Sequence, residues 1–162
     1  MKKFIIQFIF LTIIIFIALA YATGKLPNFS STGFIPKENK FKQVQLNDVK
    51  INIELADTSE KRKKGLSGSQ SLASDSGMLF IFEKQDKYSF WMKGMKFPLD
   101  FIWIKDIKIV DIIKNAKVPD AGIKDQDLPI YVPNVPVDMV LEVTAGFVDS
   151  HKIKVGDMIE LL

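Results

Sequence analysis

The chain has 162 residues, of which 48% are hydrophobic, 25% are charged and none is cysteine. This composition is typical of a globular protein, and the lack of cysteine excludes disulfides, thiolate catalysis, zinc–thiolate sites and a lipid-modified N-terminal cysteine. Of the 22 basic residues, two are Lys2 and Lys3, and the remaining 20 nearly balance 19 acidic residues. We therefore predict no nucleic-acid partner.

Residues 1–22 predict a membrane-directed helix. Two lysines precede an apolar run from Phe4 to Ala22 that only two polar residues interrupt, so a soluble helix here would lack a polar face. The run is nearly long enough to span a bilayer, yet the AYA sequence at 20–22 has the small-x-small form of a signal-peptidase site. The segment is therefore either a transmembrane anchor, with the membrane as a partner, or a signal peptide cleaved after Ala22. In both cases the positive-inside rule predicts an extracytoplasmic location for the rest of the chain.

Residues 23–39 predict a flexible linker between this segment and a folded domain. The stretch TGKLPNFSSTGFIPKEN contains two prolines, two glycines and several small polar residues. The folded domain is accordingly predicted over residues 40–162.

The domain opens with a predicted β-hairpin and a short helix. Apolar residues alternate with polar ones on both sides of Asn47-Asp48, which predicts two strands joined by a two-residue turn. Asp57 is the predicted N-cap of the helix that follows, and Gly65 or Gly68 its end. The KRKK run at 61–64 is interpreted as the solvated end of this helix rather than a nucleic-acid or lipid site.

The remaining pattern predicts six more strands, at residues 78–82, 88–92, 100–104, 107–113, 139–144 and 157–162. Short strands, tight turns and one or two short helices indicate a mainly β fold, an antiparallel β-sandwich or a distorted barrel, preceded by the N-terminal hydrophobic helix. Residues 116–138 contain four prolines and little periodicity, which is typical of a lid or a binding loop.

Five segments of the domain resemble one known family, in the same order along the chain. They are GLSGSQSL, SGMLFIF, SFWMKGMKFPLDFIWI, VLEVTAG and IKVGD. On these segments the chain is similar to the domain of unknown function 192 family, over roughly residues 40–162. The resemblance implies a single compact β-rich domain, secreted or tethered to a membrane, and it implies no activity.

The sequence departs from the family pattern in two places. Where the family usually reads G-L-M-x-R, residues 65–69 read GLSGS, so the methionine and the arginine are missing. An anion-binding role of that arginine therefore does not carry over. Where the family usually reads F-W-M-K-N-T, Gly94 and Met95 replace the asparagine and threonine. Two polar groups that would contact a ligand are thus absent.

Period two within the predicted strand at 88–92 separates a core face from a site face. Phe90 and Met92 share the face that we interpret as core, while Trp91 shares the other face with polar residues and is predicted to border a site. Trp103 is interpreted as core. The predicted groove draws on Ser89, Trp91, Lys93, Asp100, Tyr131 and Glu142.

Aromatic side chains with a few polar groups suit a small molecule, a glycan or a peptide. The first functional hypothesis is therefore a binding or accessory module of the cell envelope, with no catalytic residue, no resident metal and no cofactor.

Two other chemistries remain open from the residues alone. Asp100 and Glu142 are a candidate carboxylate pair for an envelope carbohydrate hydrolase if both enter one pocket, and otherwise they pair with Lys93 or accept backbone hydrogen bonds. The thioethers of Met78, Met92 and Met95 suit Cu(I), although methionine also fills β cores routinely. His151, the single histidine, is interpreted as a surface residue at a helix end.

Overall fold

A computed structural model describes residues 41–162 of the protein. The predicted N-terminal helix (1–22) and linker (23–39) lie outside these residues. Within the described part, no helix combines the length and the hydropathy that crossing a membrane requires.

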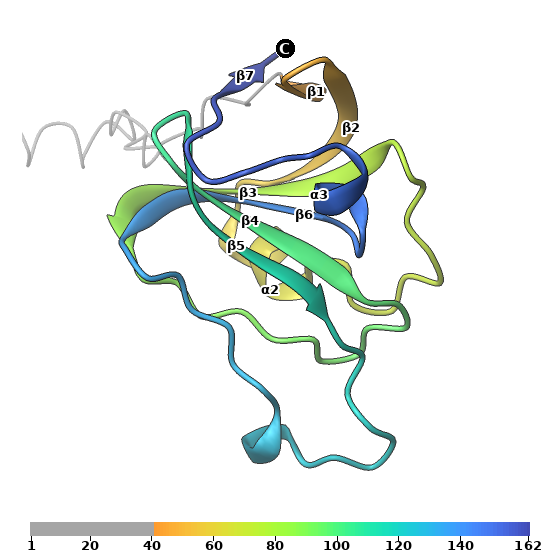
Figure 1. The fold of residues 1–162 in the computed structure, drawn as a ribbon. Helices are drawn as coiled ribbons and strands as arrows, with labels where there is room; N and C mark the ends of the chain where they lie inside the picture. The colour runs from red at the N-terminus through yellow and green to blue at the C-terminus, as the bar shows by residue number, and fades with distance from the viewer. Residues whose placement is uncertain (1–40) are drawn as a thin grey trace, which may run out of the picture. The chain divides into compact units, whose positions relative to one another are not determined.

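The described chain forms a mainly β domain with two short α-helices (Figure 1). Its elements, in chain order, are β1 (Gln43–Leu46), β2 (Val49–Ala56), α2 (Ser59–Lys64), β3 (Ser76–Asp86), β4 (Leu99–Lys105), β5 (Lys108–Ala116), the 3-10 helix η1 (Asp125–Asp127), β6 (Val137–Thr144), α3 (Phe147–Ser150) and β7 (Ile159–Leu161).

The strands make one curled sheet, a half-barrel, in the order β5-β4-β6-β3-β2-β1-β7. Every strand pair is antiparallel except β2 and β3, which run parallel. The two edges approach each other near the turn between β4 and β5, where Lys108 and Met158 form an isolated bridge. Ile109 N donates to Asp157 O at 2.9 Å in the same place. A distorted barrel is thus closer to the observed fold than a sandwich of two sheets.

The predicted hairpin is confirmed, and the predicted helix cap is shifted by one residue. Asn47 adopts a positive φ of 51° in the turn between β1 and β2. Thr58, not Asp57, caps α2, because its hydroxyl accepts the backbone N–H of Lys61 at 3.2 Å. The Asp57 carboxylate instead accepts from Lys61 Nζ at 3.0 Å. The helix ends at Gly65, which is one of the two predicted end positions.

The predicted strand at 88–92 is wrong. Only Phe90 pairs there, in an isolated antiparallel bridge with Tyr131, with N–H···O distances of 2.9 and 2.8 Å. Strand β3 continues to Asp86, well beyond the predicted end at Phe82, and β6 already occupies the edge beside it. Residues 88–98 therefore cross the face of the sheet instead of joining it.

Each face of the sheet carries its own apolar cluster, and the two α-helices lie on opposite faces (Figure 1). On the α3 face, Phe147 and Val148 pack against alternate residues of β4 and β6. On the α2 face, Leu66 packs with Trp103, which is fully buried as predicted. The α2-face cluster also contains the three methionines of the copper hypothesis, Met78, Met92 and Met95.

Candidate functional site

A cavity of about 630 Å³ opens on the α2 face of the sheet. Its volume lies within the range of small-molecule sites. Four cationic side chains line it, together with five aromatic ones and a single carboxyl: Arg62, Lys63, Lys64, Lys93, Phe80, Phe82, Tyr88, Phe90, Trp91 and Glu142. The cavity therefore combines apolar walls with a strong excess of positive charge.

One wall of the cavity is α2 and the residues that follow it. Strands β2 and β3 are parallel, so the chain between them must cross over the sheet, and α2 lies in that connection. Arg62 is held in place because Nη1 donates at 2.9 Å to the carbonyl oxygens of both Asp57 and Ile81. Its guanidinium also lies 5.2 Å from the centre of the Phe82 ring. Lys63 and Lys64 are exposed and form no ion pair with any of the described residues.

The opposite wall is the crossing segment, in which burial still alternates although no strand forms. Met92 is 1% exposed and anchors the segment to the sheet, whereas Trp91 is 55% exposed. Ser89, Trp91 and Lys93 all line the cavity. Lys93 also pairs with Asp125 of η1, which ties this wall to the proline-rich loop. Buried and exposed side chains alternate here because residues such as Met92 pack onto the sheet, although the segment forms no hydrogen-bonded strand.

Glu142 lies at the floor of the cavity, on the central strand β6. Its neighbours in register are Met78 on β3 and Phe101 on β4, both apolar. The residue is 5% exposed, and burial alone raises the pKa of its carboxyl from 4.5 to about 8. No described residue forms a hydrogen bond or an ion pair with this carboxyl that would offset its burial. At pH 7 the carboxyl is therefore mostly protonated.

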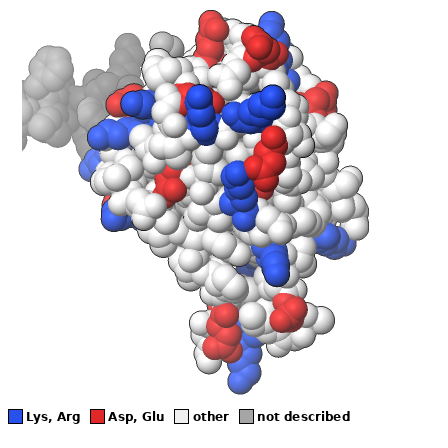
Figure 2. All heavy atoms as spheres, viewed as in Figure 1, with Lys and Arg blue, Asp and Glu red and all other residues white. Residues whose placement is uncertain are grey.

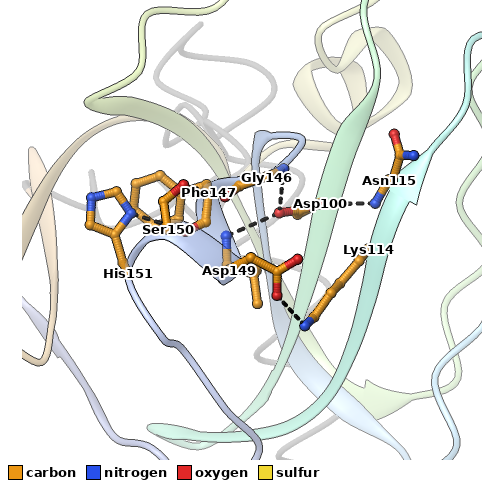
Figure 3. A network of polar contacts seen from close by, with 9 residues as sticks. Asp100, Lys114, Asn115, Gly146, Phe147, Asp149, Ser150 and His151 are labelled. Carbon is orange, nitrogen blue, oxygen red and sulfur yellow. Dashed lines mark hydrogen bonds and ion pairs between the residues drawn. The ribbon is translucent and has the colours of Figure 1, made fainter.

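Asp100 does not reach this cavity. Its carboxylate points to the α3 face, where it accepts backbone N–H groups of Asn115 at 2.8 Å and of Gly146 and Val148 at 3.0 Å each (Figure 3). The residue is fully buried, and its role is to hold the turn into α3. Placing Asp100 in the groove was wrong, because its neighbour in register on β6 is Val143 rather than Glu142.

The two-carboxylate hydrolase loses its geometric basis for the same reason. Glycoside hydrolysis by this route needs both carboxyls in one pocket, and Asp100 and Glu142 lie on opposite faces of the sheet. Among the residues that line the cavity, Glu142 supplies the one carboxyl.

Tyr131 does not line the cavity either. It lies behind the crossing segment, where it pairs with Phe90 and its ring centre is 5.3 Å from that of Phe101. The structure thus brings together four of the six predicted residues, Ser89, Trp91, Lys93 and Glu142, and supports their wall from behind with Tyr131.

The methionines and the histidine have structural roles. Only Met95 of the three methionines lines the cavity, while Met78 and Met92 are enclosed in the α2-face cluster. His151 ends α3 as predicted, but it is half-buried, and its ring lies 4.2 Å from the Phe147 ring. Within residues 41–162, no three side chains of histidine, cysteine, aspartate or glutamate converge as a metal site would require.

The family comparison agrees with this fold. The model of the DUF192 family, described as "Uncharacterized ACR", matches residues 42–161. The chain belongs to this family. The chain is similar in structure to a Sinorhizobium meliloti 1021 protein described as a candidate transcription regulator, at 31% identity and a TM-score of 0.65 over 74% of this chain and 92% of that one.

A protein of unknown function from Novosphingobium aromaticivorans DSM 12444 matches this DUF192 chain at 29% identity and a TM-score of 0.65. The match covers 73% of this chain and 83% of that one. No curated protein matches the chain.

The two places where this DUF192 chain departs from the usual pattern touch each other at the cavity. A Cβ on Gly94 would lie 2.4 Å from Ser67 Oγ, and Gly68 N donates to Gly94 O at 3.1 Å. Ser67 stands where the family usually has methionine, and Gly94 where it usually has asparagine. The two replacements by smaller residues thus meet in one contact, between the two walls of the cavity.

Sequence reasoning missed the α2 side of the site. Arg62, Lys63 and Lys64 were interpreted as a solvated helix end, and they form a cavity wall because the helix lies in a parallel crossover. The wall could have been predicted from a parallel pairing of the buried strand at 78–82 with the strand before the helix. Parallel strands need a crossover connection, which places the KRKK run over one face of the sheet.

Proposed function

We propose that this protein is a ligand-binding module of the cell envelope that takes a small molecule with a ring or apolar body and an anionic group. One observation carries the proposal: the cavity brings together five aromatic and four cationic side chains. The envelope location follows from the apolar N-terminal run and its preceding lysines.

The aromatic walls supply the surface for the body of the ligand. Phe80 and Phe90 meet edge to face with ring centres 4.9 Å apart, and Phe90 meets Trp103 in the same way at 5.2 Å. These edge-to-face contacts hold the rings of the inner wall in place, because aromatic pairs prefer this geometry. Trp91 does not belong to this group of packed rings; it is half exposed and is free to cover a bound ring.

The lysines supply the charge for the anionic group. Lys63 and Lys64 project from the end of α2, and Lys93 faces them from the crossing segment. The described residues as a whole carry no excess of positive charge, because residues 41–162 hold 17 of the 22 basic and 18 of the 19 acidic side chains, a net charge of −1.

This balance favours a small anion over a nucleic acid. Figure 2 shows acidic and basic side chains interspersed on the face that carries α3, with no continuous basic surface there. Nucleic-acid binding typically needs a basic stripe that follows a phosphate backbone. The S. meliloti relative is described as a candidate transcription regulator, and the proposal for this chain rests on its cavity rather than on that description.

The experiment is a binding screen on the full chain, read by thermal shift and by tryptophan fluorescence. The probes are aromatic carboxylates, uronic acids, acidic peptides and neutral glycans. We expect an anionic ring compound to bind, to change the Trp91 emission and to leave the buried Trp103 unaffected.

The variants Trp91→Ala and Lys63→Glu/Lys64→Glu test the site. Each is expected to weaken binding at least about tenfold while unfolding like the wild type, because the side chains are exposed and make few structural contacts. Lys154→Glu, an exposed lysine outside the cavity, is the control and should bind normally. The proposal fails if no anionic probe binds, or if Trp91→Ala binds as tightly as the wild type.

A further inference from the structure

We infer that Glu142 accepts the ammonium group of the ligand, so that the pocket selects a zwitterion whose ammonium lies at the floor and whose anionic group lies at the lysine rim. This inference rests on the proposed function and names the ligand class for the same cavity.

The first argument is that Glu142 is buried without a partner. Buried carboxyls in proteins are normally hydrogen-bonded or paired, because leaving one alone is unfavourable by several kcal/mol. Asp100 on the neighbouring strand follows that rule with three backbone donors. Glu142 has none among the described residues, yet it lines the cavity. Its carboxyl is not among the fully enclosed polar atoms that lack a partner, so it opens onto the cavity, where a ligand can supply the partner.

The second argument concerns what surrounds Glu142. From β3 and β4 the neighbours that line the cavity are apolar: Phe80, Phe82 and Leu99. The charged and titratable groups face it only from α2 (Arg62, Lys63, Lys64) and from the crossing segment (Tyr88, Lys93). Aromatic faces beside a carboxylate are the usual surroundings of a bound ammonium, which gains cation–π attraction as well as the ion pair.

The third argument is the separation of charge between the two walls and the floor. Arg62 is already held by two backbone carbonyls and the Phe82 ring, and Lys93 is paired with Asp125. None of these cations pairs with Glu142. An acid at the floor that can ionise when an ammonium binds, together with positive charge at the rim, matches an ammonium and an anion joined by a short body.

The proton balance follows directly. In the free protein the Glu142 carboxyl is protonated at neutral pH. When an ammonium binds, the carboxyl ionises, its proton leaves to solvent, and the carboxylate pairs with the ammonium, which keeps its own proton. Binding therefore releases up to one proton, and affinity rises with pH until the carboxyl is already ionised in the free protein.

The test is isothermal titration calorimetry of the full chain in buffers of different ionisation enthalpy. The probes are L-phenylalanine, L-tryptophan and a Phe-Ala dipeptide as zwitterions, with hydrocinnamate as the matched anion that lacks the ammonium. We expect a zwitterion to bind more tightly than hydrocinnamate and to release close to one proton at pH 6. Because the pKa of Glu142 is about 8, the affinity of the protein for the zwitterion should rise about fiftyfold between pH 6 and pH 8.

The variant Glu142→Gln separates the two modes of recognition. It keeps the shape and a hydrogen-bond donor, and it should bind the zwitterion at least about tenfold more weakly, with no proton release. Hydrocinnamate binding should be unchanged. If hydrocinnamate binds as tightly as the zwitterions and no proton is released, Glu142 acts as a neutral donor and this inference is overturned while the proposed function stands. If no anion-bearing probe binds at all, both are overturned.

Discussion

Asp100 and Glu142 lie one register position apart on neighbouring strands, and their carboxyls point to opposite faces of the sheet. The pairing of β4 with β6 matches Asp100 with Val143 and Phe101 with Glu142. Asp100 accepts three backbone hydrogen bonds, whereas Glu142 has no described partner. These two buried acids therefore contribute to folding in opposite ways, and each leads to a separate prediction.

Replacing Asp100 with alanine is expected to destabilise the fold by about 3 kcal/mol, because three backbone N–H groups, one buried and two partly buried, lose their acceptor. Asp100→Asn should lose less stability, since one side-chain oxygen remains to accept a hydrogen bond. Urea unfolding measures the difference. The control is Asp149→Ala in the same network, whose exposed pair with Lys114 should contribute less than about 1 kcal/mol (Figure 3). Equal losses for Asp100→Ala and Asp149→Ala would contradict the structural role of Asp100.

Glu142→Gln is expected to remove a pH dependence from the stability of the free protein. Burial raises the pKa of the folded carboxyl to about 8 from an ordinary 4.5, so the folded state holds a proton that the unfolded state has lost between these values. Wild-type stability should therefore fall as pH rises from about 4.5 to 8 and level off above. The variant should show a flatter profile and be more stable at pH 8, by on the order of a few kcal/mol.

Chemical denaturation at pH 5, 7 and 9 checks this profile without any ligand. A wild type and a Glu142→Gln variant that change in parallel over this range would show that solvent reaches the carboxyl more freely than its 5% exposure indicates.

Gly94→Ala is expected to destabilise the protein by more than the strain of its backbone alone. The position has a φ of +70°, and an added Cβ would lie 2.4 Å from Ser67 Oγ. Gly68→Ala is the matched control, because its φ is +82° and nothing lies within 4 Å of the added atom. We expect about 1 kcal/mol for Gly68→Ala and about 2 kcal/mol or more for Gly94→Ala in thermal denaturation.

The double variant Ser67→Ala/Gly94→Ala should recover the difference, since the nearest remaining atom is Ser67 Cβ at 3.6 Å. No recovery would mean that the backbone, and not the contact between the cavity walls, limits this position.

Trp103→Phe is expected to be tolerated far better than Trp103→Ala. The residue is fully buried, and its Nε1 has no hydrogen-bond partner among the described residues, so phenylalanine removes an unsatisfied donor while keeping most of the packing. Alanine leaves a large cavity and should cost about 3–5 kcal/mol. Urea unfolding followed by the emission of Trp91 measures both. A loss of stability for Trp103→Phe close to that for Trp103→Ala would point to a partner for the indole N–H.

Local patterns predicted the parts of this fold that depend on local causes. The β1–β2 hairpin follows from alternation around Asn47, and the burial of Trp103 and Met92 follows from their neighbours in sequence. The exposure of Trp91 was predicted by the same alternation, even though the strand that motivated it does not form.

Long-range pairing decided the rest, and a single sequence carries little trace of it. The pairing of Asp100 with Val143 spans more than forty residues and depends on a register that no local pattern fixes. The parallel pairing of β2 with β3 likewise turned a charged helix into a cavity wall. Tyr131 shows the same limit, because its partner Phe90 lies in a segment without a sheet neighbour.

The meeting of the two sheet edges also bears on how the protein avoids assembling with itself. An edge strand with free N–H and C=O groups is a template for pairing with another chain. Here Ile109 N is occupied by Asp157 O, Ile107 O accepts from Ile159 N, and β7 is only three residues long. At this point of the two edges, a strand from a second molecule would first have to break these contacts, so curling the sheet shortens the open edge.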